Sequence, residues 1–363
     1  MDLRGLRVVV AGAGAVGSAV ALTLQRRGAA VVLSDTADAP LNASSVAAGM
    51  LAPAMEAVLD PLSRSHFGLL KQARNRWPPF LDGITDEGAR PEQCGVLWIA
   101  AEPSQADVLE RLGELGAPAE QLSGARAEAM SQDLKAPAGG VFTGEDWRLD
   151  PRATLQAMER AFLALGGERR HAGLAAFAPG GALFQDGERL ATDAVVLATG
   201  LAPRDLAEPL PELDCLEPIK GQILRFHGAS PRSGPCVRAP GIYVAPSTGA
   251  VVAGATMEPG LDDLQVDPAA VARLQSLASG LFPPLAALEP APAAGVRSST
   301  PDGLPMVGPS SRSGLFLAVG ARRNGWLLAP LMAEVLADRI AGAAPGGWAE
   351  RLDPARFGLS QPG

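Results

Sequence analysis

The sequence predicts an α/β fold, in which a Rossmann-like nucleotide-binding domain carries an inserted domain built on an antiparallel sheet. Three observations indicate this fold. The first 35 residues alternate strand, helix and strand around a glycine-rich turn. Residues 216–256 alternate in hydrophobicity between prolines and glycines, as antiparallel strands do. Residues 315–341 return to a strand followed by a helix, and 363 residues suffice for two domains.

The first strand–helix–strand unit contains the motif G-x-G-x-x-G, with glycines at positions 12, 14 and 17. In this motif the first glycine permits a tight turn, the second lets the backbone approach a pyrophosphate, and the third allows close packing of helix on strand. The N-terminus of the following helix offers N–H groups to phosphates. The expected cofactor contacts in this turn are Gly12, Ala13, Gly14, Ala15, Val16 and Gly17.

Asp35 ends the next predicted strand, 18 residues after Gly17. At this position a carboxylate accepts hydrogen bonds from ribose hydroxyls. The residues that follow, TADAP, contain no basic side chain for a 2′-phosphate, which argues against NADP. The motif and the acid together predict a dinucleotide site, but they do not separate NAD from FAD.

The nucleotide-binding domain is expected to be discontinuous. Its middle part contains a helix at 150–167, which Asp150 caps and Pro151 begins, and a buried strand at 191–200. Its last part contains the run WLLAPLMAEVLADRI, which predicts an amphipathic helix. The expected division is 1–85, 140–215 and 292–363 for the nucleotide-binding domain, and 86–139 and 216–291 for the substrate-binding domain.

The composition excludes several classes of partner. A net charge of −8 argues against binding to nucleic acids or to anionic membrane surfaces. No apolar stretch approaches the ~18 residues of a membrane span. Three scattered histidines and three scattered cysteines predict no metal site and no disulfide framework. Free thiols lead us to expect a cytoplasmic protein; a homo-oligomer is compatible with all of this.

Several segments occur in an order that resembles a known family. They are AGAGAVGSAVAL, ASSVAAGMLAP with Glu56, DWRLDPRATLQAM, VVLATG, PIKGQ, IYVAP with GATMEP, RSSTPDGLPMVG and GARRNGWLLAP. Together they resemble the glycine oxidases of thiamine biosynthesis, within the D-amino-acid oxidase family of FAD flavoproteins. The resemblance spans nearly the whole chain and implies a D-amino-acid oxidase-like two-domain fold. It also implies FAD held without a covalent bond, because GVRSSTPD lacks the cysteine that attaches FAD in related sarcosine oxidases.

The activity that the resemblance implies is oxidative deamination. Glycine or a similar small amine is oxidised to an imine or oxo acid, ammonia and H2O2, with O2 as acceptor, to supply thiazole formation in thiamine biosynthesis. Two alternatives stay open. One is an oxidase of sarcosine or of a D-amino acid. The other is an FAD-dependent dehydrogenase that passes electrons to a quinone or a partner protein.

Arg297, Arg323 and Tyr243 are the expected catalytic residues. Arg297 lies in the apolar run AAGVRSS, where a guanidinium is costly unless it meets an anion. The family places its carboxylate-binding arginine at this position; the alternative is a structural pair with an Asp or Glu. Tyr243, the one tyrosine of the chain, matches the family tyrosine that hydrogen-bonds the carboxylate. Met50 and Met257 match positions beside the substrate, or are ordinary core methionines.

Arg323 matches a loop arginine of the family that assists carboxylate binding or lies at the flavin edge. The sequence departs from the family pattern at Ala321, where a histidine is common, and at Ser247, where an arginine is common. The further cofactor contacts that the resemblance implies are Ser44, Ser45, Ala48, Gly49, Met50, Thr199, Gly200, Arg323, Asn324, Gly325 and Trp326.

Overall fold

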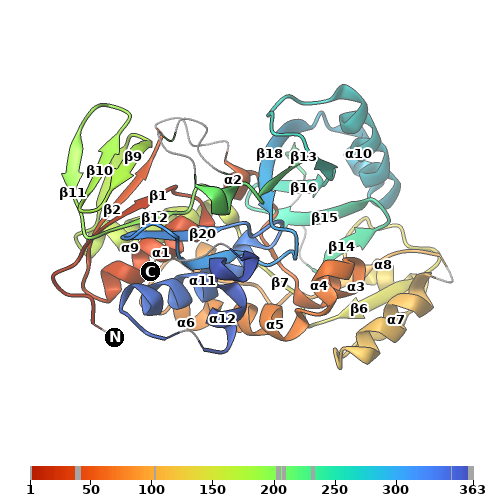
Figure 1. The fold of residues 1–363 in the computed structure, drawn as a ribbon. Coiled ribbons are helices and arrows are strands. Elements are labelled where there is room, and N and C mark those ends of the chain that lie inside the picture. The colour runs from red at the N-terminus through yellow and green to blue at the C-terminus, as the bar shows by residue number, and fades with distance from the viewer. Residues whose placement is uncertain are drawn as a thin grey trace.

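The computed structural model describes residues 2–36, 42–101, 104–201, 206, 210–229, 234–344 and 346–358. These residues form two lobes, and each lobe is built on one large sheet (Figure 1). One lobe combines parallel strands with helices, and the other is dominated by antiparallel strands. The predicted α/β fold class is therefore confirmed.

The first lobe contains a six-stranded sheet in the order β19–β20–β12–β1–β2–β8 within the described residues. The strands from β20 to β8 are parallel, and β19 is antiparallel to β20. Apolar β-branched runs such as RVVVA suit such a sheet, because it is covered on both faces. The strands span Arg7–Ala11 (β1), Ala30–Asp35 (β2), Glu168–His171 (β8), Ala194–Leu197 (β12), Met306–Pro309 (β19) and Leu315–Val319 (β20).

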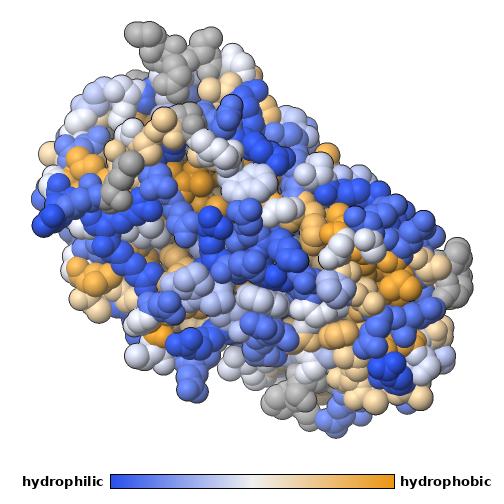
Figure 2. Space-filling view, turned by 90° about the horizontal axis from the view of Figure 1, so that it is seen from below, coloured by the Kyte–Doolittle hydropathy of each residue, from blue (hydrophilic) through white to orange (hydrophobic). Residues whose placement is uncertain are grey.

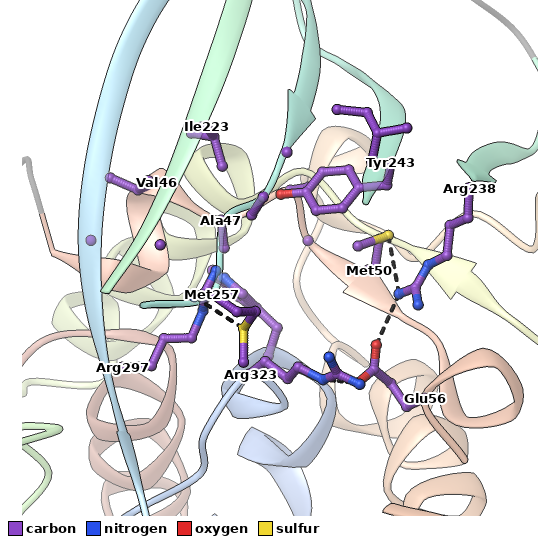
Figure 3. A pocket seen from close by; sticks show the side chains of 18 of the residues that line it. Val46, Ala47, Met50, Glu56, Ile223, Arg238, Tyr243, Met257, Arg297 and Arg323 are labelled. Carbon is purple, nitrogen blue, oxygen red and sulfur yellow. Dashed lines mark hydrogen bonds and ion pairs between the residues drawn. The ribbon is translucent and has the colours of Figure 1, made fainter. Parts of the chain in front are cut away.

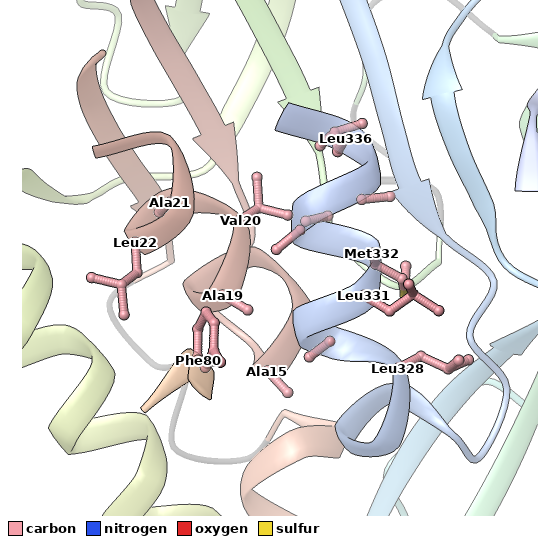
Figure 4. Close-up of a cluster of buried hydrophobic side chains, with 14 of the residues drawn as sticks. Ala15, Ala19, Val20, Ala21, Leu22, Phe80, Leu328, Leu331, Met332 and Leu336 are labelled. Atoms are coloured by element: carbon pink, nitrogen blue, oxygen red, sulfur yellow. The ribbon is translucent and has the colours of Figure 1, made fainter. Parts of the chain in front are cut away.

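Alternate residues of β1 face two different layers. Val8 and Val10 belong to the core that contains α1 (Ala15–Arg26) and α11 (Gly325–Ile340), and Figure 4 shows these two helices packed side by side. Val9 faces the opposite layer, a small sheet formed by β9 (Leu174–Ala178), β10 (Gly181–Phe184) and β11 (Arg189–Ala191). The alternation of side chains along a strand thus buries β1 on both faces.

Helix α11 is buried on most of its surface, whereas the sequence predicted an amphipathic helix. It packs against α1, β19 and α5 (Phe67–Asn75) at once. Pro330 lies inside this helix and has no N–H to donate to the carbonyl of Trp326. The indole Nε1 of Trp77 donates to that carbonyl instead, at 3.0 Å. A neighbouring side chain therefore compensates the hydrogen bond that the proline removes.

The second lobe contains a sheet in the order β17–β13–β16–β15–β14–β4–β6–β5, with β18 on the free edge of β13. The predicted antiparallel pairing over 216–256 is confirmed, and β14 and β4 form the parallel pair. Helix α10 (Pro268–Leu281) covers one face. The strands span Val96–Trp98 (β4), Glu120–Leu122 (β5), Gly140–Thr143 (β6), Glu217–His227 (β13), Cys236–Ala239 (β14), Ile242–Ser247 (β15), Ala250–Gly254 (β16), Glu258–Pro259 (β17) and Ala291–Ser299 (β18).

Strand β18 pairs with β13 from Ala291 to Ser299. Arg297 therefore belongs to the antiparallel sheet of the second lobe, whereas the sequence analysis placed it in the expected nucleotide-binding domain. The physical reason is that β13 is long and offers a second edge, which β18 completes along its whole length. Strand β6 also pairs inside this sheet. We propose the expected domain division with its boundaries at 140 and 292 moved past these two strands.

The surface of the molecule is mixed in character. Figure 2 shows a face on which hydrophilic residues predominate and hydrophobic residues form smaller areas between them. Of the helices in the described part of the chain, none combines the length and the apolar character that crossing a bilayer requires. The remaining elements are α2 (Ala43–Val46), β3 (Met50–Leu51), α3 (Pro53–Leu59), α4 (Pro61–Arg64), α6 (Trp77–Phe80), α7 (Ser104–Glu114), α8 (Gly124–Ala129), β7 (Trp147–Arg148), α9 (Pro151–Ala164) and α12 (Trp348–Leu352), with 3₁₀ turns at Glu87–Ala89, Pro211–Leu213, Pro283–Ala287 and Pro354–Phe357.

Candidate functional site

The glycine motif forms the turn between β1 and α1, and each glycine is required by a close approach. Gly12 has a φ of 103°, and a Cβ there would lie 2.5 Å from the carbonyl oxygen of Ala198. A Cβ on Gly17 would lie 1.8 Å from the carbonyl oxygen of Gly12, and one on Gly14 would lie 2.9 Å from Oγ of Ser44. Only glycines therefore let strand, helix and the following loop converge at this point.

The carboxylate of Asp35 lies beside this turn. Its Oδ2 accepts a hydrogen bond from the N–H of Ala13 at 2.7 Å, and its Oδ1 accepts one from Thr36 at 2.8 Å. These bonds fix the carboxylate at the carboxyl end of the parallel strands, where ligands bind in this class of fold. The rest of the TADAP segment, from which the sequence argued against NADP, lies outside the described residues.

A cavity of about 500 Å³ opens at the carboxyl ends of β1, β2, β12 and β20. Ala13 and Ser45 instead line a neighbouring hollow beside Arg152 and Arg169, and Gly17 is packed against Gly12. The predicted cofactor residues that line the large cavity are Gly12, Gly14, Ala15, Val16, Asp35, Ser44, Thr199, Gly200 and Gly325.

A second cavity, of about 330 Å³, lies between the two lobes (Figure 3). Ala43 and Arg297 line both cavities, so the two adjoin there. Besides Arg297, this cavity brings together predicted residues that do not line the first one: Ala48, Gly49, Met50, Tyr243, Met257, Arg323, Asn324 and Trp326.

The loop between the cavities is anchored from both lobes. Arg225 of β13 donates from Nη2 to the carbonyl oxygens of Ser45 and Val46, at 2.9 and 3.1 Å. The indole of Trp326 donates to the carbonyl oxygen of Ser44 at 3.0 Å. Small side chains in α2 leave space on the cavity side, while these bonds hold its backbone in place.

Strand register explains why distant residues meet in the second cavity. Ile223, Gly254, Tyr243, Arg238 and Trp98 are paired in turn across five adjacent strands. Paired residues project to the same face of a sheet. All five therefore line the same cavity, on the face opposite to α10.

Arg297 projects from β18 over Gly221 of the paired strand, where the absence of a side chain makes room for the guanidinium. Its contact is with Sδ of Met257 at 3.8 Å, and no carboxylate in the described part of the chain lies within ion-pair distance. Burial lowers the pKa of Arg297, and the attraction of Tyr243 opposes this only in part. A half-buried cation without an anion is the feature expected of an anion-binding site.

Tyr243 points its hydroxyl into the same cavity as Arg297 (Figure 3). A Cβ on Gly254 would lie 2.8 Å from this hydroxyl, so the glycine gives it room. Burial raises the pKa of Tyr243, which keeps the phenol protonated at neutral pH. The group is therefore available as a hydrogen-bond donor in the cavity that Arg297 also lines.

Arg323 is directed at Glu56, a residue to which the sequence analysis assigned no role. Its Nε lies 2.5 Å from Oε2 of Glu56, and its Nη2 lies 3.5 Å from Oδ2 of Asp60. Arg238, also missed, donates from Nη2 to Oε1 of Glu56 at 2.9 Å. A signal was present for Arg238, because CVRAP is an apolar run with one arginine, as AAGVRSS is around Arg297.

Asp146 holds the helix that carries Glu56. Its two carboxylate oxygens accept hydrogen bonds from the N–H groups of Ala54 and Met55, at 2.8 and 3.0 Å, in the first turn of α3. Burial raises the pKa of Asp146 to about 6, although Arg238 and these hydrogen bonds lower it. Asp146 thus caps α3 and fixes Glu56 in the wall of the cavity.

Metal chemistry has no evident site in the described ranges, since no group of three or more His, Cys, Asp or Glu there is arranged to hold an ion. None of the three histidines lines either cavity. The site is therefore characterised by guanidiniums, carboxylates and one phenol around an elongated pair of cavities.

Comparisons with known proteins agree with this arrangement. The family described as "FAD dependent oxidoreductase" matches residues 7–339. The glycine oxidase of Pseudomonas aeruginosa is 30% identical over 376 residues, which covers 97% of this chain and 98% of that protein. The bifunctional protein ThiO/ThiG of Nostoc sp. is 30% identical over 92% of this chain, but the chain spans only about half (52%) of that relative. The crystal structure of glycine oxidase from Geobacillus kaustophilus has a TM-score of 0.80 at 27% identity, covering 98% and 99% of the two chains.

Proposed function

Because the chain belongs to the family of FAD-dependent oxidoreductases, we propose that it catalyses the oxidative deamination of glycine or of a similarly small amino acid. The products are the imine or its oxo acid, ammonia and, with O2 as acceptor, H2O2. The similarity to the two glycine oxidases over nearly the whole chain supports this substrate class.

The residues of the two cavities fit FAD. The glycines at 12 and 14 allow the β1–α1 backbone to approach a pyrophosphate, and α1 begins there without a side-chain cap. Asp35 keeps a lone pair on each oxygen for ribose hydroxyls besides the N–H bonds it already accepts. The loop at 43–50 and the turn at 320–326 offer small residues where the cavities adjoin. Bound there, FAD would supply the acceptor for the hydride that leaves the α-carbon of the amino acid.

One observation carries the proposal: the half-buried guanidinium of Arg297 has no carboxylate partner in the described residues, and it faces the same cavity as the Tyr243 hydroxyl. An amino-acid carboxylate supplies the missing anion. Arg297 binds it through two parallel N–H···O bonds, and Tyr243 donates a third hydrogen bond to it. This clamp fixes the substrate by the end that does not react, so its α-carbon is held in one orientation.

The chain contributes positioning and electrostatics. Glu56 is a weak base, because two guanidiniums engage its two oxygens and lower its pKa. The positive Arg297 favours loss of a proton from the nearby substrate ammonium, which delivers the neutral amine that can be oxidised. The N-terminus of α11, preceded by Asn324 in the cavity wall, would stabilise negative charge that develops on a cofactor bound beside it.

Apolar side chains border the carboxylate clamp in the second cavity. In Figure 3, Ile223 lies near Tyr243, and Met257 lies near Arg297. One additional methylene on a substrate changes the free energy that discriminates it from glycine by only about 1–3 kcal/mol. Sarcosine and D-alanine are therefore alternative substrates. We further propose that the imine supplies thiazole formation in thiamine biosynthesis, which the name of the ThiO/ThiG relative supports.

Anaerobic reduction tests the function directly. The FAD-loaded protein is mixed with glycine, sarcosine, D-alanine or D-proline, and the flavin absorbance is followed. We expect bleaching that is fastest with glycine, and recovery of the absorbance in air with formation of H2O2. Absence of bleaching with every amine would refute the oxidation of amino acids. Bleaching without recovery in air would instead identify a dehydrogenase.

A further inference from the structure

The wall of the substrate cavity contains an ion cluster centred on Glu56. Figure 3 shows Arg238 and Arg323 both directed at this carboxylate. Their nitrogens lie 2.9 Å from Oε1 and 2.5 Å from Oε2, so one guanidinium is assigned to each oxygen. The side chains of Glu56 and Arg238 are 9% and 8% exposed, which means that water screens this cluster weakly.

Three separate elements hold the cluster in place. Arg238 projects from β14, where it pairs with Tyr243 and faces the same cavity. Glu56 lies in α3, which Asp146 caps, and Arg323 lies in the turn before α11. Because these elements are packed independently, the cluster is a fixed part of the wall and not a pair of mobile surface ions.

The charges of this region leave one guanidinium uncompensated. Burial raises the pKa of Glu56, but the attraction of Arg323 and Arg238 outweighs it and the net shift is downward, so Glu56 stays ionised. Asp60 pairs with Arg322 and lies near Arg323, and Asp146 attracts Arg238. Four guanidiniums thus meet three carboxylates in the described residues: Arg238, Arg297, Arg322 and Arg323 against Glu56, Asp60 and Asp146.

We propose that Glu56 determines substrate specificity by restricting the site to amino acids with a single carboxylate. It neutralises Arg238 and Arg323, and so leaves Arg297 as the guanidinium of the cavity that is open to an anion. A second carboxylate on the substrate would have to approach Glu56, and it finds no unpaired cation there. This inference rests on the proposed function, since it concerns the substrate of the same site.

Removal of the charge on Glu56 should weaken this preference. In Glu56→Gln the side chain keeps its size, but Arg238 and Arg323 lose their anion and become available to a second carboxylate. Glu145→Gln is the matched control, because Glu145 also pairs with two cations, Lys71 and Arg74, at 3.2 and 3.0 Å, but lines neither cavity.

Equilibrium binding measures the preference without turnover. The flavin absorbance of the FAD-loaded protein is titrated with propionate and with succinate, which do not react. In the unmodified protein and in Glu145→Gln, we expect succinate to bind at least tenfold more weakly than propionate. In Glu56→Gln, the ratio of the two dissociation constants should shift toward succinate by about tenfold or more, and the gain should shrink as salt is added.

Two results would overturn the proposal. One is that the unmodified protein binds succinate as tightly as propionate. This measurement does not depend on whether a variant folds. The other is a folded, FAD-loaded Glu56→Gln with an unchanged ratio. If that variant does not retain FAD, the double variant Glu56→Gln/Arg238→Gln removes the excess cation and leaves Arg323 open, and the same shift is required of it. Failure of every amine to bleach the flavin would refute the proposed function separately, since these titrations do not depend on oxidation.

Discussion

The glycine at position 221 gives the sharpest test of the carboxylate clamp. Gly221→Ala would place a Cβ 2.1 Å from Nη1 and 2.5 Å from Nη2 of Arg297, well inside contact distance. The clashing atoms are the end of a flexible side chain and not backbone. We therefore expect the pairing of β13 with β18 to persist while the guanidinium moves away from its position beside Tyr243.

The magnitude follows from the bonds that are lost. Hydrogen bonds to charged groups contribute about 1.5–3 kcal/mol each. Loss of one of the two Arg297–carboxylate bonds should thus weaken binding of a carboxylate about 10- to 100-fold. The affinity for FAD should change little, because Gly221 does not line the cavity that holds the dinucleotide motif.

The assay compares three quantities in the same preparations: the dissociation constant of acetate from the flavin absorbance, the KM for glycine, and the midpoint of thermal unfolding. Gly181→Ala is the matched control, since it adds the same methyl group to a strand where the nearest atom is 3.6 Å away. A Gly221→Ala protein that is folded and binds acetate like the unmodified protein would refute the assignment of Arg297 as the carboxylate anchor.

Three further predictions address the neighbouring groups. Tyr243→Phe keeps the ring and removes the hydrogen-bond donor, so the KM for glycine should rise about 5- to 20-fold with an unchanged flavin spectrum. A KM equal to that of the unmodified protein would mean that Tyr243 only packs against its neighbours. Asp35→Ala removes the acceptor of the Ala13 N–H and of the ribose hydroxyls, and should weaken FAD binding about 10- to 100-fold in reconstitution of the apoprotein; an unaltered affinity would contradict the placement of the ribose. Asp146 has its pKa raised from 3.8 to about 6, so the folded state retains a proton that the unfolded state loses, and the free energy of unfolding should fall by about 2 kcal/mol between pH 4 and pH 6 through this group. Asp146→Asn should remove that part of the pH dependence, and an identical slope in both proteins would show that the pKa of Asp146 is ordinary.

Predictions from the sequence were most complete where the interacting residues are neighbours along the chain. The β1–α1 turn, the capped start of α9 and the antiparallel pairing after residue 216 depend on local spacing. For α9, the side chain of Asp150 accepts hydrogen bonds from the N–H groups of Arg152 and Ala153, as the predicted N-cap requires. Such contacts are encoded by residue types a few positions apart.

The errors arose where a partner distant in sequence changes the outcome. Strand β18 follows the helix α10 and precedes the last strands of the first lobe. Its own residues do not indicate that it pairs with the free edge of β13. Helix α11 carries charges that suggest a polar face, yet neighbours on several sides bury it. Glu56 was named with the segments that carry the family resemblance, but its role depends on Arg238, which is 182 residues away, and on Arg323.

The sequence by itself thus determined the α/β class, the dinucleotide turn and, through family resemblance, FAD and the identity of Tyr243 and Arg297 as candidates. Only the tertiary structure decided which charges are paired. Whether a guanidinium is free to bind substrate depends on the carboxylates within a few ångströms of it, and these come from strands, helices and turns far apart in the chain. Arg297 and Arg323 look alike as residues; the fold gives Arg323 to Glu56 and leaves Arg297 unpaired over Gly221.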